Sequence, residues 1–215
     1  MSKVIVPYIT LREGEERDLS ELAYWSDGSG LGYTNERPQD RDHRGVLWTR
    51  NRQPTPVDAP AGAPQWSEVH PARQRAMMMT LRCQVCAAPA RTRAGSIFLT
   101  GLRPNDRPFG EGDFTTQPPV CPRHAFVSAK RCPHLYEHEL QVFLVQRPRL
   151  YGVRVTRLMP APSGVLKPAP GDYDEAADAP VPYGDPGLPW MLATQLARQL
   201  REVTTVPLRE IRALL

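Results

Sequence analysis

Two pairs of potential metal ligands constrain the fold of this chain more than any other feature. Cys83 and Cys86 form a C-x-x-C pair, Cys121 and His124 form a C-x-x-H pair, and 34 residues lie between the pairs. Each pair can hold one side of a tetrahedral ion from a tight turn, and the interval can fold back to bring the pairs together. The spacing therefore predicts one structural site, with Zn2+ as the cofactor.

The residues around the second pair decide which donor completes the set. Pro122 follows Cys121 directly, and proline is favoured at the first position of a helix. The run 122–131 is predicted to be a short helix, with cations near its carboxyl end. Cys132 comes eleven residues after Cys121, roughly 16 Å along such a helix, so one ion cannot bind both. The predicted ligands are Cys83, Cys86, Cys121 and His124.

The order of a cysteine knuckle, a β-hairpin around Gly95 to Gly101 and a ligand pair at a helix start resembles a treble-clef zinc finger. The resemblance covers about 50 residues and implies a zinc-centred fold rather than an activity, since one fold serves many functions. Ordinary thiols in a reducing compartment are the alternative. A redox pair is disfavoured because Pro89 soon follows the C-x-x-C, where a redox motif would open a helix.

Composition narrows the class of protein only partly. The chain has 215 residues, 24 Arg against three Lys, 24 Pro and a formal charge of +4. This charge mildly favours nucleic acid but does not require it. We find neither a secretory signal nor a run apolar enough for a membrane span, so a cytoplasmic location and no membrane partner are expected. The arginine bias and abundant alanine are typical of a high-GC bacterial genome.

The predicted fold class is α+β, with a small zinc-centred, treble-clef-like module, antiparallel hairpins and C-terminal helices. Four regions are expected along the chain: an N-terminal strand and loop region with a linker, a zinc-centred core, a Pro-rich acidic loop and C-terminal helices. Their respective bounds are 1–64, 65–159, 160–189 and 190–215.

Local patterns predict the individual elements. Strands are expected at 4–9 and 45–50, and a helical turn near Leu19 to Trp25. A helix opening at Pro71 should run into the knuckle, with Met77, Met78 and Leu81 inward and Arg73 and Arg75 outward. After Pro189, an amphipathic helix with Leu192, Leu196, Leu200 and Val203 on one face should precede a second short helix ending at Leu215.

The segments 139–146 and 150–159 are predicted to form an antiparallel hairpin that carries the densest group of cations. Its four arginines, beside Tyr151, could contact a phosphate backbone, whereas a solvated polar face is the alternative. They are Arg147, Arg149, Arg154 and Arg157.

Several further side chains have both a functional and a structural interpretation. His70 could be catalytic beside the metal module, but a helix-start or surface histidine is favoured, and no catalytic residue is predicted. Cys132, with His134 nearby, could be a reactive thiolate or an alternative ligand, although a buried thiol at a helix end is favoured. The tryptophans Trp25, Trp48 and Trp66 are expected in or near the core rather than stacked on bases.

The segments VHPARQ, CQVC, PPVC and CPHL together resemble a group of uncharacterised proteins from streptomycete-type actinobacteria. The resemblance implies a shared zinc-centred architecture and no particular activity. This chain has His124 where the group is expected to have a cysteine, and either residue can bind zinc. The leading hypothesis is a non-enzymatic protein that recognises nucleic acid or a regulatory protein partner. The alternative is an enzyme, either a treble-clef nuclease or a small-molecule tailoring enzyme.

Overall fold

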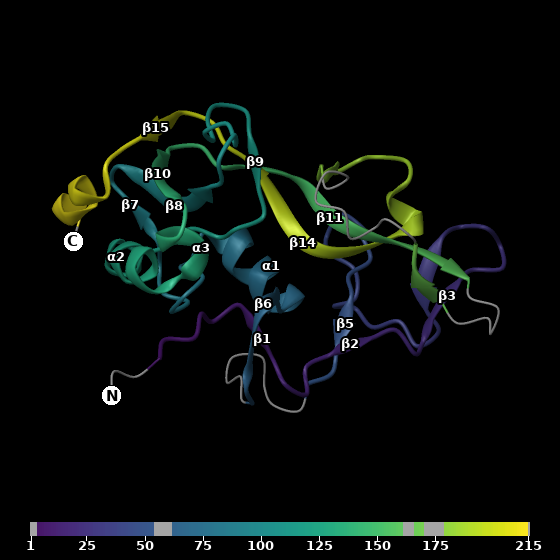
Figure 1. Ribbon diagram of the computed structural model, residues 1–215. Coiled ribbons are helices and arrows are strands. Elements are labelled where there is room, and N and C mark those ends of the chain that lie inside the picture. Colours follow the sequence, from purple (N-terminus) through teal and green to yellow (C-terminus); the bar gives the residue numbers. More distant parts are fainter. Residues whose placement is uncertain (1–3, 54–61, 161–165, 170–178, 215) are drawn as a thin grey trace. The chain divides into compact units, whose positions relative to one another are not determined.

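A computed structural model describes residues 4–53, 62–160, 166–169 and 179–214 (Figure 1). Its helical segments are α1 (Pro71–Thr80), α2 (Pro122–Arg131), α3 (Pro133–Tyr136) and the 3-10 helices η2 (Leu188–Trp190) and η3 (Leu208–Leu214). The strands before α2 are β1 (Thr10–Arg12), β2 (Arg17–Asp18), β3 (Leu22–Tyr24), β4 (Leu31–Tyr33), β5 (Arg50–Asn51), β6 (Pro64–Val69), β7 (Arg91–Thr92), β8 (Gly95–Leu102) and β9 (Phe114–Thr115). The later strands are β10 (Glu139–Val145), β11 (Arg149–Pro160), β12 (Leu166–Pro168), β13 (Val181–Pro182), β14 (Met191–Gln199) and β15 (Val203–Thr205). The fold is therefore mixed, with mostly antiparallel strands and few helices, as predicted for the coarse class.

The chain divides into two compact units, each built from separated segments. Unit 1 contains residues 1–9, 73–150 and 198–215, and unit 2 contains residues 10–72 and 151–197. The regions predicted from composition are continuous along the chain, whereas these units are not.

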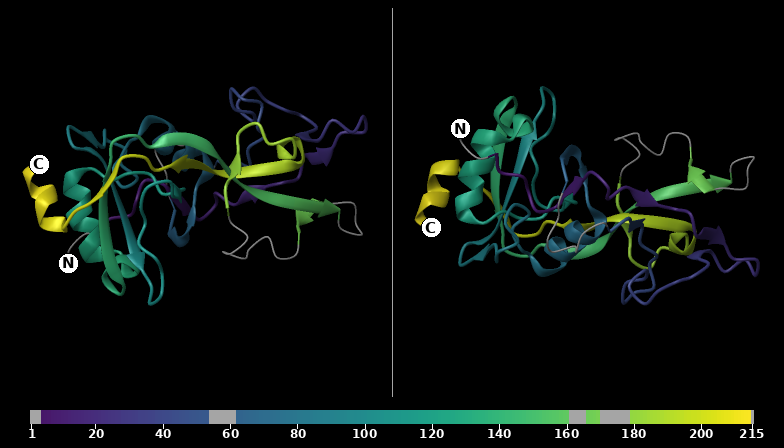
Figure 2. Two further views of the ribbon diagram at one scale, coloured as in Figure 1. Left: turned by 90° about the horizontal axis from the view of Figure 1, so that it is seen from above. Right: turned by 90° about the horizontal axis from the view of Figure 1, so that it is seen from below.

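Unit 1 is built around a four-stranded antiparallel sheet in the order β15-β10-β8-β7. Strands β8 and β10 pair along their length, from Glu139 opposite Leu102 to Val145 opposite Ser96. Helix α2 packs against β8, α3 and η3 (Figure 2). The core under these helices contains Cys83, Ala90, Ile97, Val120, Ala125, Val142 and Ile211. One of the predicted metal ligands is thus part of the hydrophobic core.

Unit 2 contains short antiparallel pairs, β1 with β6, β2 with β5 and β3 with β4. Its buried cluster contains Leu22, Leu31, Tyr33, Leu47, Leu158, Leu166 and Leu192. Strands β11 and β14 are neighbours in a further sheet, and each contributes residues to both units. Within the described residues, no helix is both long and apolar enough to cross a bilayer.

The helix predicted after Pro189 is wrong, because residues 191–199 form strand β14. Leucine, alanine and glutamine favour helices, but propensity is a weak prior that tertiary packing overrides. Strand β14 lies between β11 and β9 and is buried on both faces, so it lacks the alternation that usually identifies a strand. The second short helix is confirmed as η3.

The predicted hairpin of 139–146 with 150–159 is also wrong, although both segments are strands. Strand β10 pairs with β8 and β15, while β11 pairs with β12, β13 and β14. Both edges of β10 are therefore occupied, which leaves no edge for β11. The expected hairpin around Gly95 to Gly101 is instead the single strand β8, and the tight turn lies between β7 and β8.

Three N-terminal expectations need correction as well. Residues 4–9 are not a strand, and the first strand begins at Thr10. The expected helical turn near Leu19 to Trp25 contains strand β3, which pairs with β4. The strand expected at 45–50 is reduced to isolated bridges at Leu47 and Trp48 before β5.

Helix α1 confirms the helix predicted to lead into the knuckle, but Arg73 is buried rather than exposed. Met77 and Met78 are buried as predicted, whereas Arg73, predicted to face solvent, is fully buried. Arg73 lies over the ring of Tyr8, with 6.0 Å between Cζ and the ring centroid. Most of the linker in 51–64 lies outside the described residues. In the loop predicted over 160–189, residues 161–165 and 170–178 lie outside them, and the described part contains β12, β13 and the start of η2.

Candidate metal centre

The two predicted ligand pairs come together in unit 1. One donor atom from each of Cys83, Cys86, Cys121 and His124 lies within 4.8 Å of the other three. Nδ1 of His124 is 3.2 Å from Sγ of Cys121 and 3.8 Å from Sγ of Cys83. Around a tetrahedral zinc ion, neighbouring ligand atoms are roughly 3.5 to 3.8 Å apart, given bonds of about 2.0 and 2.3 Å. The observed spacing is therefore compatible with one small tetrahedral metal ion.

The first pair is held by a tight turn that starts where α1 ends. The N–H of Cys83 donates to the carbonyl of Ala88, and the N–H of Ala87 donates to the carbonyl of Cys83, both at 2.8 Å. Ala87 has a φ of 57°, in the left-handed region that glycine favours. This turn places both sulfur atoms on the same side of the backbone.

The second pair lies at the start of α2. Cys121 is the N-cap residue, Pro122 occupies the first turn, and the Cys121 carbonyl accepts a 3.0 Å hydrogen bond from the N–H of Ala125. His124 follows within the same turn, so the helix geometry brings its ring back toward Cys121. The helix bounds agree with the sequence prediction of 122–131.

Backbone hydrogen bonds join the two pairs across the long interval. The N–H of Gln84 donates to the carbonyl of Pro119 at 3.0 Å. The N–H of Val120 donates to the carbonyl of Ile97 in β8 at 2.9 Å. These two bonds align the segment before Cys121 with the knuckle and with the central strand. The sequence pattern predicted the meeting of the pairs but gave no sign of these particular bonds.

The electrostatic environment suits ligands that are neutral until a cation binds. Burial raises the pKa of the Cys83 thiol, against hydrogen bonds from the N–H groups of Cys121, Cys86 and Val85. Burial likewise raises the pKa of Cys86, and burial and then Arg123 lower the pKa of His124. A neutral imidazole is the metal-binding form, and N–H groups directed at sulfur stabilise a thiolate once a cation replaces its proton. The donor set therefore fits a metal ion.

The end of α1 is fixed by a buried arginine from β14, the segment that was predicted to be a helix. Arg198 donates from Nε to the Met78 carbonyl at 2.9 Å and from Nη2 to the Met79 carbonyl at 3.0 Å. Its Nη1 donates to the carbonyl of Pro148. The N–H of Arg82 donates to the Met77 carbonyl at 2.9 Å. The last carbonyls of α1 are thus satisfied one turn before the first ligand.

The other candidate residues lie away from this cluster. Cys132 is the C-cap of α2 and is outside the four-donor group, and all four cysteines are free. The rings of His134 and His138 lie 5.1 Å apart near α3. His70 directly precedes α1, which confirms the helix-start interpretation, but it is fully buried rather than at the surface. Its Nε2 lies 3.1 Å from Nε2 of Gln53.

The tryptophans divide between core and surface. Trp48 is buried, as expected, whereas Trp66 is 60% exposed and Trp25 is 36% exposed. Asp42 accepts hydrogen bonds from Trp48 Nε1 at 3.1 Å and from the Tyr183 hydroxyl at 2.8 Å, which gives Asp42 a structural role.

The four arginines predicted to share a hairpin face do not share one. Side chains alternate between the two faces of a strand. Arg149 and Arg157 are an even number of residues apart in β11 and share one face, whereas Arg154 lies on the opposite face. Arg147 forms an ion pair with Glu202 at 3.0 Å. In addition, Arg147 and Arg149 belong to unit 1, and Arg154 and Arg157 belong to unit 2.

The formal charge of unit 1, which contains the four candidate ligands, differs strongly from the net charge of the whole chain. Unit 1 has 17 Lys and Arg against 7 Asp and Glu, a charge of +10, and unit 2 has 10 against 16, a charge of −6. The modest total of +4 therefore conceals a basic unit and an acidic unit.

Comparison of the chain with family models, with curated proteins and with solved structures found no match in any of the three searches.

Proposed function

We propose that this chain is a structural-zinc protein of the cytoplasm in which a treble-clef-like unit recognises a negatively charged macromolecule. The observation that carries the proposal is the four-donor set of three thiols and one imidazole, which leaves no position for a catalytic water on a tetrahedral ion. Soft sulfur donors with one nitrogen suit Zn2+ better than the hard cations Mg2+ or Ca2+.

Three features support the treble-clef interpretation. The knuckle around Cys83 and Cys86 precedes the short β7–β8 hairpin, and the second pair lies at the start of α2. Cys83 also belongs to the core that Ala125 and Ile211 share, so a bound ion would link the helices to the sheet. Because such a site rarely forms in an unfolded chain, the free energy of metal binding would contribute to folding.

The charge of unit 1 supports a polyanionic partner, either nucleic acid or an acidic face of a regulatory protein. A formal charge of +10 on unit 1 attracts such partners and accelerates their association more strongly than the net charge of +4 on the whole chain would suggest.

The metal content of purified protein tests the structural-zinc proposal. We expect one equivalent of zinc per chain, and we expect Cys86→Ser to lose both the metal and the folded state of unit 1. Cys132→Ser is the matched control, because Cys132 lies outside the donor group and its replacement should leave zinc content unchanged. Less than about half an equivalent of zinc in the purified wild-type protein would contradict a structural zinc site.

A further inference from the structure

A groove of about 460 Å3 lies beside the metal site within unit 1. Residues 89–93, which follow the knuckle, form one side, and Pro122, the first residue of α2, lies next to the ligand Cys121. Ala213 and Leu214, at the end of η3, complete the lining. The groove is therefore bounded by three elements that the four-donor site and its core hold together.

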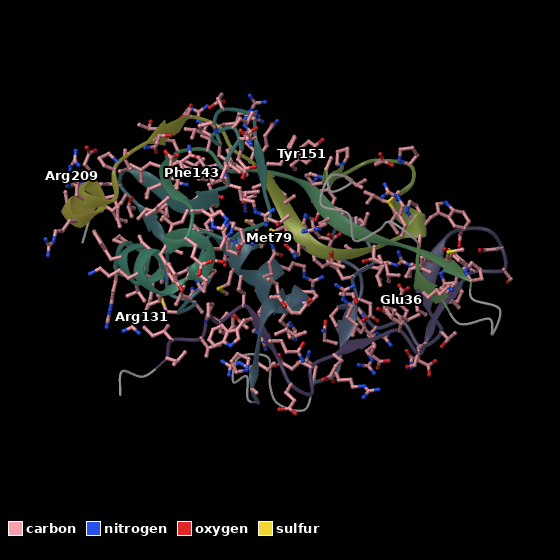
Figure 3. All side chains as sticks on the ribbon, in the orientation of Figure 1. Glu36, Met79, Arg131, Phe143, Tyr151 and Arg209 are labelled. Atoms are coloured by element: carbon pink, nitrogen blue, oxygen red, sulfur yellow. The ribbon has the colours of Figure 1, made fainter. Side chains whose placement is uncertain are left out.

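The three segments that line this groove carry five exposed arginines, which we call the groove arginines: Arg91, Arg93, Arg123, Arg209 and Arg212. Arg91 and Arg93 line the groove, while Arg123 and Arg212 are adjacent in sequence to lining residues. Figure 3 shows Arg209 on η3. Arg212 follows it by three residues, and residues three apart lie on the same face of a 3-10 helix.

Few negative charges oppose the groove arginines. None of them has an ion-pair partner among the residues that the structure describes, and Glu210 is the one carboxylate on β7, α2 and η3. Arg91 donates a single 3.4 Å hydrogen bond to the carbonyl of Gln146. Elsewhere in unit 1, Arg147 and Arg201 lie beside Glu202 and Glu111. The groove thus concentrates positive charge that the described residues leave uncompensated.

We infer that the groove arginines bind the phosphate backbone of a nucleic acid duplex. Guanidinium groups pair bidentately with phosphate, and 15 of the 17 cations of unit 1 are arginines. These features recognise regularly spaced phosphates.

The composition of the groove lining favours a duplex over a single strand. Its described lining consists of proline, alanine, leucine, threonine and arginine side chains and offers no aromatic ring on which an unpaired base could stack. Proteins that bind single strands generally use such rings. Contacts to phosphate alone carry little sequence information, so binding should be nearly independent of sequence. This inference rests on the proposed function, because the metal site holds the three elements together.

Fluorescence anisotropy with a short labelled DNA duplex and zinc-loaded full-length protein tests the inference. If all five groove arginines contact phosphate, the logarithm of affinity should fall with the logarithm of salt concentration with a slope of about −4.5. Affinity should then decrease about 500-fold between roughly 50 and 200 mM salt. The double variant Arg93→Gln with Arg212→Gln should have a slope of about −2.7 and decrease about 40-fold over the same range.

The matched control removes the same charge from unit 1 at two arginines that do not line the groove, with Arg147→Gln and Arg149→Gln. This variant should keep the wild-type slope, and equal losses in both variants would overturn the inference in favour of a general charge effect. Equal or tighter binding to a single strand would overturn the duplex assignment. Binding to polyglutamate but not to the duplex would overturn it in favour of an acidic protein partner. Zinc content and circular dichroism distinguish the two proposals, since a zinc-loaded, folded protein that binds no duplex contradicts this inference alone.

Discussion

At the scale of single residues, Arg198 joins the end of helix α1 to Pro148, which lies between β10 and β11. It is 8% exposed, burial lowers the pKa of its guanidinium, and three backbone carbonyls accept its hydrogen bonds. Arg198→Met should destabilise unit 1 by about 3 kcal/mol, because buried carbonyls lose charged donors. Arg201→Met, which removes a more exposed cation beside Glu111, should cost less than about 1 kcal/mol. Urea unfolding followed by circular dichroism measures both, and equal costs would contradict this role for Arg198.

The ion pair between Asp40 and Arg50 makes the stability of unit 2 depend on pH. Burial raises the pKa of Asp40, but hydrogen bonds from Arg50 and from the N–H of Arg37 outweigh this effect, so the pKa lies below its ordinary value. Arg50 donates from Nε to Asp40 at 2.9 Å, and its Cζ lies 3.8 Å from the centroid of the Tyr33 ring. Burial also raises the pKa of Tyr33 to about 12, so its hydroxyl stays protonated near neutral pH.

Because the folded pKa of Asp40 is lowered, its stabilisation is present above the unfolded value of about 3.9 and is lost as pH falls through the folded pKa. Asp40→Asn should therefore cost about 3 kcal/mol near pH 7, since it leaves Arg50 buried without a carboxylate. The difference from wild type should stay constant down to about pH 5 and narrow below about pH 4. Urea unfolding across this range measures it, and a difference independent of pH would show that the charge of Asp40 is not responsible.

At the scale of elements, the knuckle contains a residue whose backbone conformation costs free energy. Ala87 has a φ of 57°, and this region costs a residue with a Cβ about 1 to 2 kcal/mol. Ala87→Gly should stabilise the protein by about 1 kcal/mol, after the greater freedom of glycine in the unfolded chain is included. Ala88→Gly, one residue later and without a positive φ, should destabilise it by about 0.5 to 1 kcal/mol. Thermal unfolding of zinc-loaded protein measures both, and stabilisation by both changes would refute the argument.

The same scale shows which parts of the structure could be predicted from sequence. Helix α2 was predicted with its observed bounds because Pro122 and Pro133 mark its limits locally. The four donors were predicted because ligand spacing reports on a shared ion rather than on the surrounding fold. Strand β14 was not, because its neighbours β11 and β9 are distant in sequence and their packing overrides the helical preference of leucine and alanine. Arg198 was missed for the same reason, since its carbonyl partners lie 50 to 120 residues earlier.

At the scale of the whole molecule, the net charge of the chain is a sum over two units of opposite formal charge. The chain passes between the units at Ile9, Ala72, Leu150 and Ala197, so no continuous window of sequence isolates the basic unit. Only the contacts of the folded chain separate +10 from −6. Charge becomes informative about partners once it is assigned to a surface.

The division into units also predicts which elements should lose stability when the metal is removed. All four donors and the core around Cys83 and Ile211 belong to unit 1, whereas the cluster around Tyr33 belongs to unit 2. Removing zinc with a strong chelator should therefore accelerate amide exchange in α2, β8 and η3, because site formation and folding are coupled there. Amides of the β3–β4 pair should keep most of their protection.

Hydrogen exchange read by mass spectrometry, with and without chelator, resolves these segments. Cys132→Ser should respond to the chelator as the wild type does, since Cys132 is not a donor. Cys86→Ser should exchange rapidly in unit 1 before any chelator is added, because it begins without the ion. Equal loss of protection in β3–β4 and β8 would mean that strands β11 and β14, which contribute to both units, make the chain unfold as one cooperative body. Selective loss in unit 1 would instead show that the four-donor site stabilises its own unit.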